Sequence, residues 1–249
     1  MSIGTIGAMV FVGIATVALP LGIMAFLRRR GGSWRAFLAG AGTFVLFALV
    51  LEPVLHSLIL RSETGAVIQG NILLYGLYGG LMAGLFEETG RFLAFRFMLR
   101  KQKAGITALS YGMGHGGVEA FLLVGLTMMS NLALGLAYTG GDALSPEMAA
   151  AAEALVSTPA GMFLWAGFER VSAIMLHMAN SVLVFAAVTT SRRWLFPAAI
   201  LTHTAVNFAA VVSAAFLPVA ATEGIVFLIS AAAAAWAAGI YKTLSVAEA

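Results

Sequence analysis

The chain has 249 residues, of which 61% are hydrophobic and only 10% are charged, and its mean hydropathy is +0.96. This composition excludes a soluble domain, so the net charge of +3 does not indicate a nucleic-acid partner. Because the chain lacks cysteine, disulfide bonds and thiolate metal ligands are also excluded.

Seven apolar segments follow one another along the chain, and each has the length of a membrane-spanning helix. They cover residues 3–27, 36–60, 71–99, 105–138, 160–190, 195–217 and 224–241. The sequence therefore predicts an all-α, polytopic membrane helix bundle of about seven spans, formed by a single domain over residues 1–249.

The basic residues gather on one side of this bundle if successive segments alternate in direction. Ten of them fall on the side of Arg28, and only Arg61 falls on the other side. Cytoplasmic loops are enriched in lysine and arginine, so we expect the N-terminus outside and the C-terminus inside a cell membrane. The ten are Arg28, Arg29, Arg30, Arg35, Arg100, Lys101, Lys103, Arg192, Arg193 and Lys242.

One stretch outside the predicted spans also has the pattern of a helix. Ser145 suits an N-cap, Pro146 suits the first helical position, and an alanine-rich run follows. We expect residues 146–157 to form a short helix on the external surface.

Two carboxylates and a guanidinium lie within five residues of the third span, as Glu87, Glu88 and Arg91. Ionisable groups inside a membrane are costly and mark functional sites by default. Arg91 follows Glu88 by three residues and Glu87 by four, so it can reach either carboxylate along one helix face. Glu87 and Glu88 point about 100° apart and are expected to have different roles.

Three histidines in later spans lie at the same predicted depth as this pair. Glu88, His115, His177 and His203 are each 10–15 residues from a cytoplasmic basic residue of their own span, which is roughly 15–22 Å along a helix. We therefore expect Glu87 and the three histidines to line one water-accessible cavity, open to the cytoplasmic half.

Each histidine has a polar neighbour on its own helix face that can fix its tautomer. The pairs are His115 with Glu119, His177 with Asn180, and His203 with Asn207. We expect Glu119 and Asn180 to support the site rather than to react. Glu169 and Arg170 lie nearer the outer side and are interpreted as a structural ion pair.

This layer suits the activation of water in two ways. A buried glutamate can act as general base while histidine and asparagine donors stabilise an oxyanion. Alternatively, His115, His177 and His203 can bind zinc, with Glu87 or Glu119 as the fourth ligand. The spacing of the residues leaves both open, and the chain has no HExxH or GxSxG motif.

Two non-hydrolytic classes also remain. One is a membrane scaffold that keeps the polar layer without catalysis. The other is a proton- or metal-coupled transporter, since carboxylate and histidine chains relay protons. The transporter is the less favoured of the two because the sequence shows no internal repeat.

Four stretches of the chain resemble the YhfC family of intramembrane metalloproteases. They are EETGRF (87–92), GMGHGGVEA (112–120), FERVSAIMLHMANSVLV (168–184) and HTAVNF (203–208). The resemblance extends to the wider group of glutamic-type membrane proteases that includes type II CAAX prenyl endopeptidases (CPBP/Abi) and PrsW.

The resemblance implies an intramembrane protease of a prokaryotic plasma membrane, in contact with lipid, acting on a membrane-embedded or membrane-proximal peptide. It assigns Glu87 and Glu88 as the catalytic carboxylate pair, Arg91 as their partner, and His203 with Asn207 as an HxxxN element for the oxyanion or water. The CAAX proteases usually carry EExxxR, whereas this chain has one residue fewer before Arg91.

Overall fold

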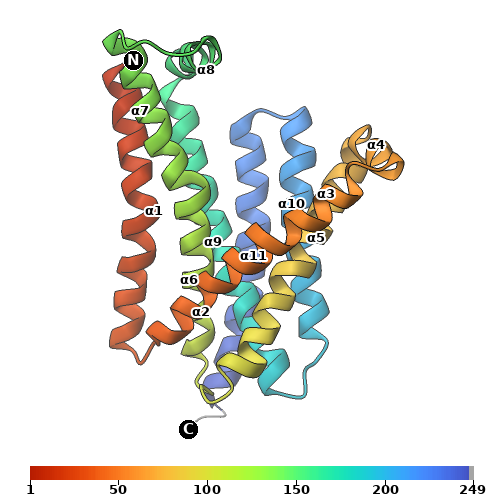
Figure 1. The fold of residues 1–249 in the computed structure, drawn as a ribbon. Helices are drawn as coiled ribbons and strands as arrows, with labels where there is room; N and C mark the ends of the chain where they lie inside the picture. Colours follow the sequence, from red (N-terminus) through yellow and green to blue (C-terminus); the bar gives the residue numbers. More distant parts are fainter. Residues whose placement is uncertain (247–249) are drawn as a thin grey trace.

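Helices account for the regular structure of residues 1–246, the part of the chain that the computed structural model describes (Figure 1). Six helical spans have the length and apolarity needed to cross a membrane. A seventh results when the helix α4 (Glu63–Gln69) and the helical segment Ile72–Met98, which meet at a 110° bend, are counted as one span. The polytopic all-α bundle expected from the sequence is therefore confirmed.

Four of the long helices are uninterrupted. They are α1 (Ile3–Arg29), α9 (Ala160–Thr189), α10 (Leu195–Phe216) and α11 (Val219–Val246). The other three long segments each contain a π-helical stretch. They are α2 (Trp34–Phe44), η1 (Val45–Leu51) and α3 (Glu52–Ile59); α5 (Ile72–Leu93) and η2 (Ala94–Met98); and α6 (Ile106–Glu119), η3 (Ala120–Gly125) and α7 (Leu126–Gly140).

The π-helical stretches adjoin the charged residues of these spans. Segment η3 starts directly after Glu119, η2 starts three residues after Arg91, and η1 ends directly before Glu52. A π-turn shifts the register of the side chains that follow it, and such turns are frequent at functional sites. The positions of the three π-helical stretches thus indicate that a functional site lies in the middle of the bundle.

Two short helices lie outside the spans, toward the end of the bundle that holds the N-terminus (Figure 1). Helix α8 (Pro146–Ser157) begins as predicted, and the Ser145 hydroxyl accepts a hydrogen bond from the backbone N–H of Met148 at 3.3 Å. Helix α4 (Glu63–Gln69) was not anticipated from the sequence, although Ser62 caps it in the same way.

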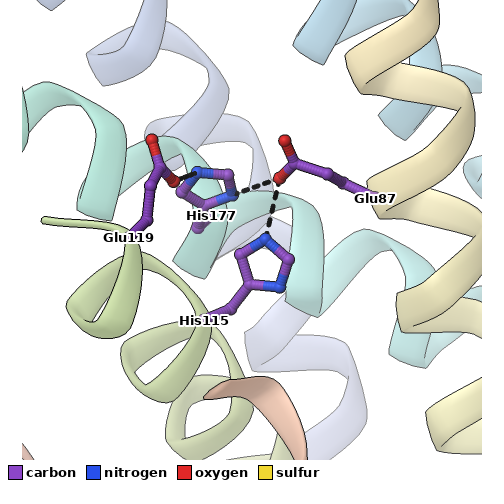
Figure 2. A group of neighbouring side chains, drawn as sticks. All are labelled: Glu87, His115, Glu119 and His177. Carbon is purple, nitrogen blue, oxygen red and sulfur yellow. Dashed lines mark hydrogen bonds and ion pairs between the residues drawn. The ribbon is translucent and has the colours of Figure 1, made fainter. Parts of the chain in front are cut away.

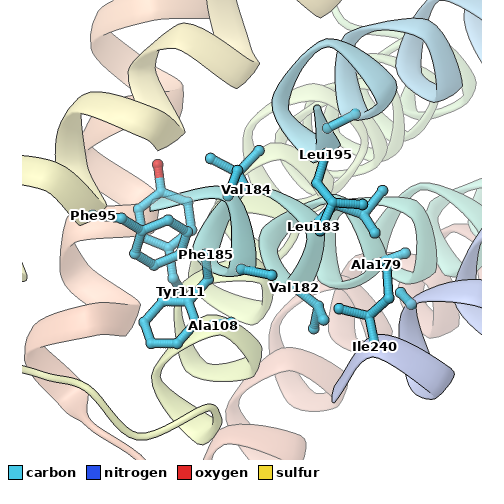
Figure 3. Close-up of a cluster of buried hydrophobic side chains, with 14 of the residues drawn as sticks. Phe95, Ala108, Tyr111, Ala179, Val182, Leu183, Val184, Phe185, Leu195 and Ile240 are labelled. Carbon is cyan, nitrogen blue, oxygen red and sulfur yellow. The ribbon is translucent and has the colours of Figure 1, made fainter. Parts of the chain in front are cut away.

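Helix α9 is central and packs against α1, α6, α10 and α11, while α5 packs along α10. The start of α1 and the end of α11 lie at opposite ends of the bundle, as an odd number of crossings requires (Figure 1). Every residue of α9 from 179 to 187 is buried, and all of them except Asn180 and Ser181 belong to a large apolar core (Figure 3). Most of this core lies in the half of the bundle nearer the loops that carry the basic residues.

Candidate metal centre and active site

The polar residues of four helices meet beside this core. The imidazole rings of His115 and His177 have centroids 4.6 Å apart, and those of His177 and His203 are 5.4 Å apart. All three histidines are buried, as are Glu87, Glu88 and Arg91 of α5. The structure thus brings together in one layer the groups that the sequence places at one depth.

Glu87 lies where the three imidazoles converge. Its Oε2 atom is 2.8 Å from Nε2 of His115 and 3.8 Å from Nδ1 of His177 (Figure 2). Its Oε1 atom is 3.8 Å from Nε2 of His203. One carboxylate therefore faces all three rings, with one short contact and two longer ones.

Glu88 has a different environment, although it is the next residue. Arg91 donates from Nη1 to both carboxylate oxygens, at 2.8 and 2.6 Å. Asn180 donates to Oε1 at 3.1 Å, and Nδ1 of His203 lies 2.8 Å from the same oxygen. Glu88 is fully buried, so its hydrogen bonds are all to protein groups that it holds in place.

Glu119 joins the layer to an ion pair farther along the bundle. Its Oε2 atom is 2.5 Å from Nε2 of His177, and its Oε1 atom accepts from Nη1 of Arg170 at 2.7 Å. Arg170 also pairs with Glu169. The sequence-based interpretation of Glu169 and Arg170 as a structural pair thus missed the contact to Glu119, because that contact crosses between α9 and the end of α6.

A group of four residues has the composition of a metal site. Ligand atoms of Glu87, His115, Glu119 and His177 all lie within 4.8 Å of one another, and all four residues are placed in the interior (Figure 2). Imidazole and carboxylate donors in a compact group suit zinc. This set differs from the three-histidine set expected from the sequence, since His203 is held by Glu88 instead.

The contact between Arg91 and His177 bears on metal binding. Nη2 of Arg91 lies 3.1 Å from Nδ1 of His177, and a guanidinium can only donate. Nδ1 is therefore the acceptor, and the proton of neutral His177 is on Nε2, facing Glu119. Binding of a metal through Nε2 requires this proton to leave or to move to Nδ1, and a proton on Nδ1 is incompatible with the Arg91 contact.

A cavity of about 80 Å³ adjoins the layer, enough for a few water molecules. Glu87, His177, His203 and Asn207 are among the residues that line it, whereas His115 is fully buried behind Glu87. No hydrogen bond links the side chain of Asn207 to another residue within 1–246, so its amide is free to donate into the cavity.

The cavity differs from the expected one in its direction. Its remaining walls come from residues on the side of the layer away from the basic loops, among them Ala173 of α9, Ala210 of α10 and Val226 of α11. The sequence predicts an opening toward the cytoplasmic half, whereas apolar side chains of the core pack on that side of the layer.

One supporting residue, Thr202, is not predicted from the sequence. Thr202 donates from its hydroxyl to Oδ1 of Asn180 at 2.7 Å and so fixes which end of that amide faces Glu88. The signal was weak, since a threonine beside His203 in an apolar span is common and its partner lies on another helix.

Comparison with known proteins places the chain in a family. Residues 15–227 match the family described as YhfC intramembrane metalloprotease. The chain is 35% identical over 240 residues to the Bacillus subtilis (strain 168) protein named uncharacterized membrane protein YhfC, with 90% of this chain and 92% of that protein covered. No solved structure matches the chain. The chain therefore belongs to the YhfC family of intramembrane metalloproteases.

Proposed function

We propose that the chain is an intramembrane peptidase that hydrolyses a peptide bond in a membrane-embedded or membrane-proximal substrate. The observation that carries the proposal is the compact group of Glu87, His115, Glu119 and His177 beside a buried cavity. Membership of a family described as intramembrane metalloproteases supports it.

In this proposal His115, His177 and Glu119 would hold a zinc ion, and binding through Nε2 of His177 would release the contact of its Nδ1 with Arg91. Two imidazoles and one carboxylate are a common donor set of catalytic zinc sites, which keep a further position open for water. Bound zinc supplies a water that is nucleophilic near neutral pH and polarises the scissile carbonyl. Arg170 fixes the Glu119 carboxylate through Oε1 and leaves Oε2 directed at His177.

Glu87 acts as the general base. It is the carboxylate that lines the cavity and faces all three imidazoles. Its Oε1 atom has no hydrogen-bond partner among residues 1–246 and lies 3.8 Å from Nε2 of His203, so Oε1 is the oxygen that takes the proton from the attacking water. Side chains positioned for such proton transfer contribute about 10²–10⁴ in rate.

His203 and Asn207 act on the other side of the peptide bond. Nδ1 of His203 is held by Glu88, so its Nε2 faces the cavity and can carry a proton to the leaving nitrogen. The amide of Asn207, one helical turn away, donates to the oxyanion that forms on the carbonyl oxygen. Glu88, Arg91 and Asn180 keep this arrangement rigid through their buried hydrogen bonds.

The proposal is tested by comparing membrane peptides from cells that make the wild-type chain, Glu87→Gln or Glu63→Gln. Glu87→Gln removes the base with little change in shape, whereas Glu63 is exposed outside the spans and serves as the control. We expect a set of cleavage products to vanish with Glu87→Gln and to persist with Glu63→Gln. Identical products from the two variants would instead favour a non-catalytic scaffold.

A further inference from the structure

The two sides of the polar layer are packed very differently. On the cytoplasmic side, Ala179 and residues 182–187 of α9 are buried in an apolar core that includes Phe95, Tyr111 and Leu195 (Figure 3). On the external side, residues 165–170 of the same helix are all partly exposed, and so are residues 207–212 of α10. The loosely packed side is the one into which the cavity extends.

Charged side chains border this looser region. The side chains of Glu169, Arg170 and Glu119 are 29%, 13% and 12% exposed. Glu169 is nine residues from the start of α9 at Ala160, roughly 14 Å along the helix and therefore within the membrane. Charges at such a depth face water-filled cavities or other protein groups rather than lipid, because exposure to hydrocarbon is costly. Their partial exposure thus indicates water at this level.

Helix α11 contributes a further carboxylate to the same region. Glu223 lies within electrostatic range of Glu169 and Arg170, and it is one turn from the cavity-lining Val226. Its Oε2 atom is buried and has no hydrogen-bond partner among residues 1–246. The region therefore holds the carboxylates of Glu119, Glu169 and Glu223 against the single guanidinium of Arg170.

We propose that the cavity is the inner end of a water-filled vestibule that opens to the external side of the membrane between α9, α10 and α11, and that a peptide segment reaches Glu87 from the outer half of the bilayer. The peptide as occupant rests on the proposed function, whereas the direction of opening is a property of the fold. The excess of carboxylates favours a segment that carries a basic side chain over one that carries an acidic side chain.

The chain's lack of cysteine permits a direct test by single-cysteine labelling. Ala210→Cys places a thiol on the cavity wall, Ser157→Cys marks the external surface, and Thr190→Cys marks the cytoplasmic surface. Intact cells and inside-out vesicles are treated with membrane-impermeant methanethiosulfonates. We expect Ala210→Cys to react in intact cells, as Ser157→Cys does, while Thr190→Cys reacts in inside-out vesicles only.

The sign of the electrostatic potential in the vestibule is measured with two labelling reagents of opposite charge and similar size. Relative to Ser157→Cys, a trimethylammonium reagent should modify Ala210→Cys at least about threefold faster than a sulfonate reagent. Adding Glu223→Gln should lower this ratio, and Glu63→Gln should leave it unchanged.

Reaction of Ala210→Cys from the cytoplasmic side only would overturn the proposal. The proposal would also be overturned if neither Ala210→Cys nor Ala173→Cys, a second position that lines the cavity, reacted with the reagents from either side of the membrane. Because labelling needs no catalysis, these outcomes are independent of whether Glu87→Gln abolishes cleavage.

Discussion

At the scale of single residues, the neighbouring carboxylates Glu87 and Glu88 differ in what surrounds them. Both oxygens of Glu88 accept hydrogen bonds from Arg91, and Asn180 and His203 add contacts to one of them. Glu87 has one short contact, to His115, and lines the cavity. A carboxylate with all its partners in place stabilises the fold, while one with a free oxygen beside a cavity can exchange protons.

Glu88→Gln should therefore destabilise the protein more than Glu87→Gln does. The substitution leaves the Arg91 guanidinium fully buried without its counter-charge, and breaking a buried ion pair costs about 3–5 kcal/mol. Thermal unfolding of the purified variants in detergent measures the difference, with Glu63→Gln as the exposed control. Equal melting temperatures for the two variants would show that Glu88 does not stabilise the fold more than Glu87 does.

Arg170→Lys tests whether Arg170 positions Glu119. The guanidinium binds Glu119 and Glu169 at once, whereas a lysine ammonium lacks the planar fork that bridges two carboxylates. Loss of such support typically lowers metal affinity about 10–100-fold. Zinc content at limiting free zinc should fall in Arg170→Lys and stay unchanged in Arg61→Lys, which alters an exposed arginine. An unchanged affinity for zinc would show that Arg170 does not position Glu119 and is only a structural partner of Glu169.

Most of the candidate site can be predicted from the sequence because depth in a membrane can be counted along helices. Glu87, His115, His177 and His203 were expected at one level, and the structure brings them together. The sequence does not show which histidine contacts which carboxylate. The contacts of His203 with Glu88 and of His177 with Glu119 depend on how each helix is rotated about its axis. That rotation is set by packing between helices.

At the scale of helices, the position of α6 depends on glycines that face both of its neighbours. A Cβ atom on Gly112 would lie 2.7 Å from Cα of Met178 and 2.8 Å from the carbonyl oxygen of His177. A Cβ atom on Gly114 would clash with the carbonyl oxygen of Phe37 in α2. Small residues allow membrane helices to approach backbone to backbone. This close approach places the His115 ring against that of His177.

Gly112→Ala should thus force α6 away from α9. Overpacking of a close interface costs about 1–3 kcal/mol, and here it also separates His115 from His177. We expect a lower melting temperature and weaker zinc binding than in the wild type. Gly239→Ala provides the matched control, because nothing lies within 4 Å of a Cβ atom at that position of α11. If the two alanine variants behaved alike, the contact between α6 and α9 would be looser than the structure indicates.

The helices themselves differ in how far they could be predicted. The spans and α8 follow from apolar length and capping residues, so both were found. The sequence does not predict the bend between α4 and α5 or the three π-helical stretches, because neither feature changes the apolar composition of a segment. A change of register in a helix that is hydrophobic on all sides has no signature in its composition.

At the scale of the whole molecule, the candidate metal ligands connect helices that are far apart in the sequence. His115 and Glu119 end α6, His177 is in the middle of α9, and Glu87 approaches from α5. A ligand that binds only the folded state stabilises it by RT ln(1 + [L]/Kd), about 2.7 kcal/mol at a concentration 100-fold above Kd. Zinc binding should therefore be measurable as stability of the entire bundle.

We expect the purified wild-type protein to unfold at a lower temperature after treatment with a chelator, and zinc to restore the original value. Magnesium should not restore the unfolding temperature, because it prefers an all-oxygen octahedral site to imidazole ligands. His115→Ala should abolish the effect of zinc, whereas His56→Ala should retain it, since His56 lies outside the cluster and pairs with Glu52 and Tyr78. A melting temperature insensitive to zinc, with well under one equivalent bound and undiminished cleavage, would contradict the metal site. Glu87 and His203 alone would then transfer the proton. Both line the cavity, and Oε1 of Glu87 lies 3.8 Å from Nε2 of His203.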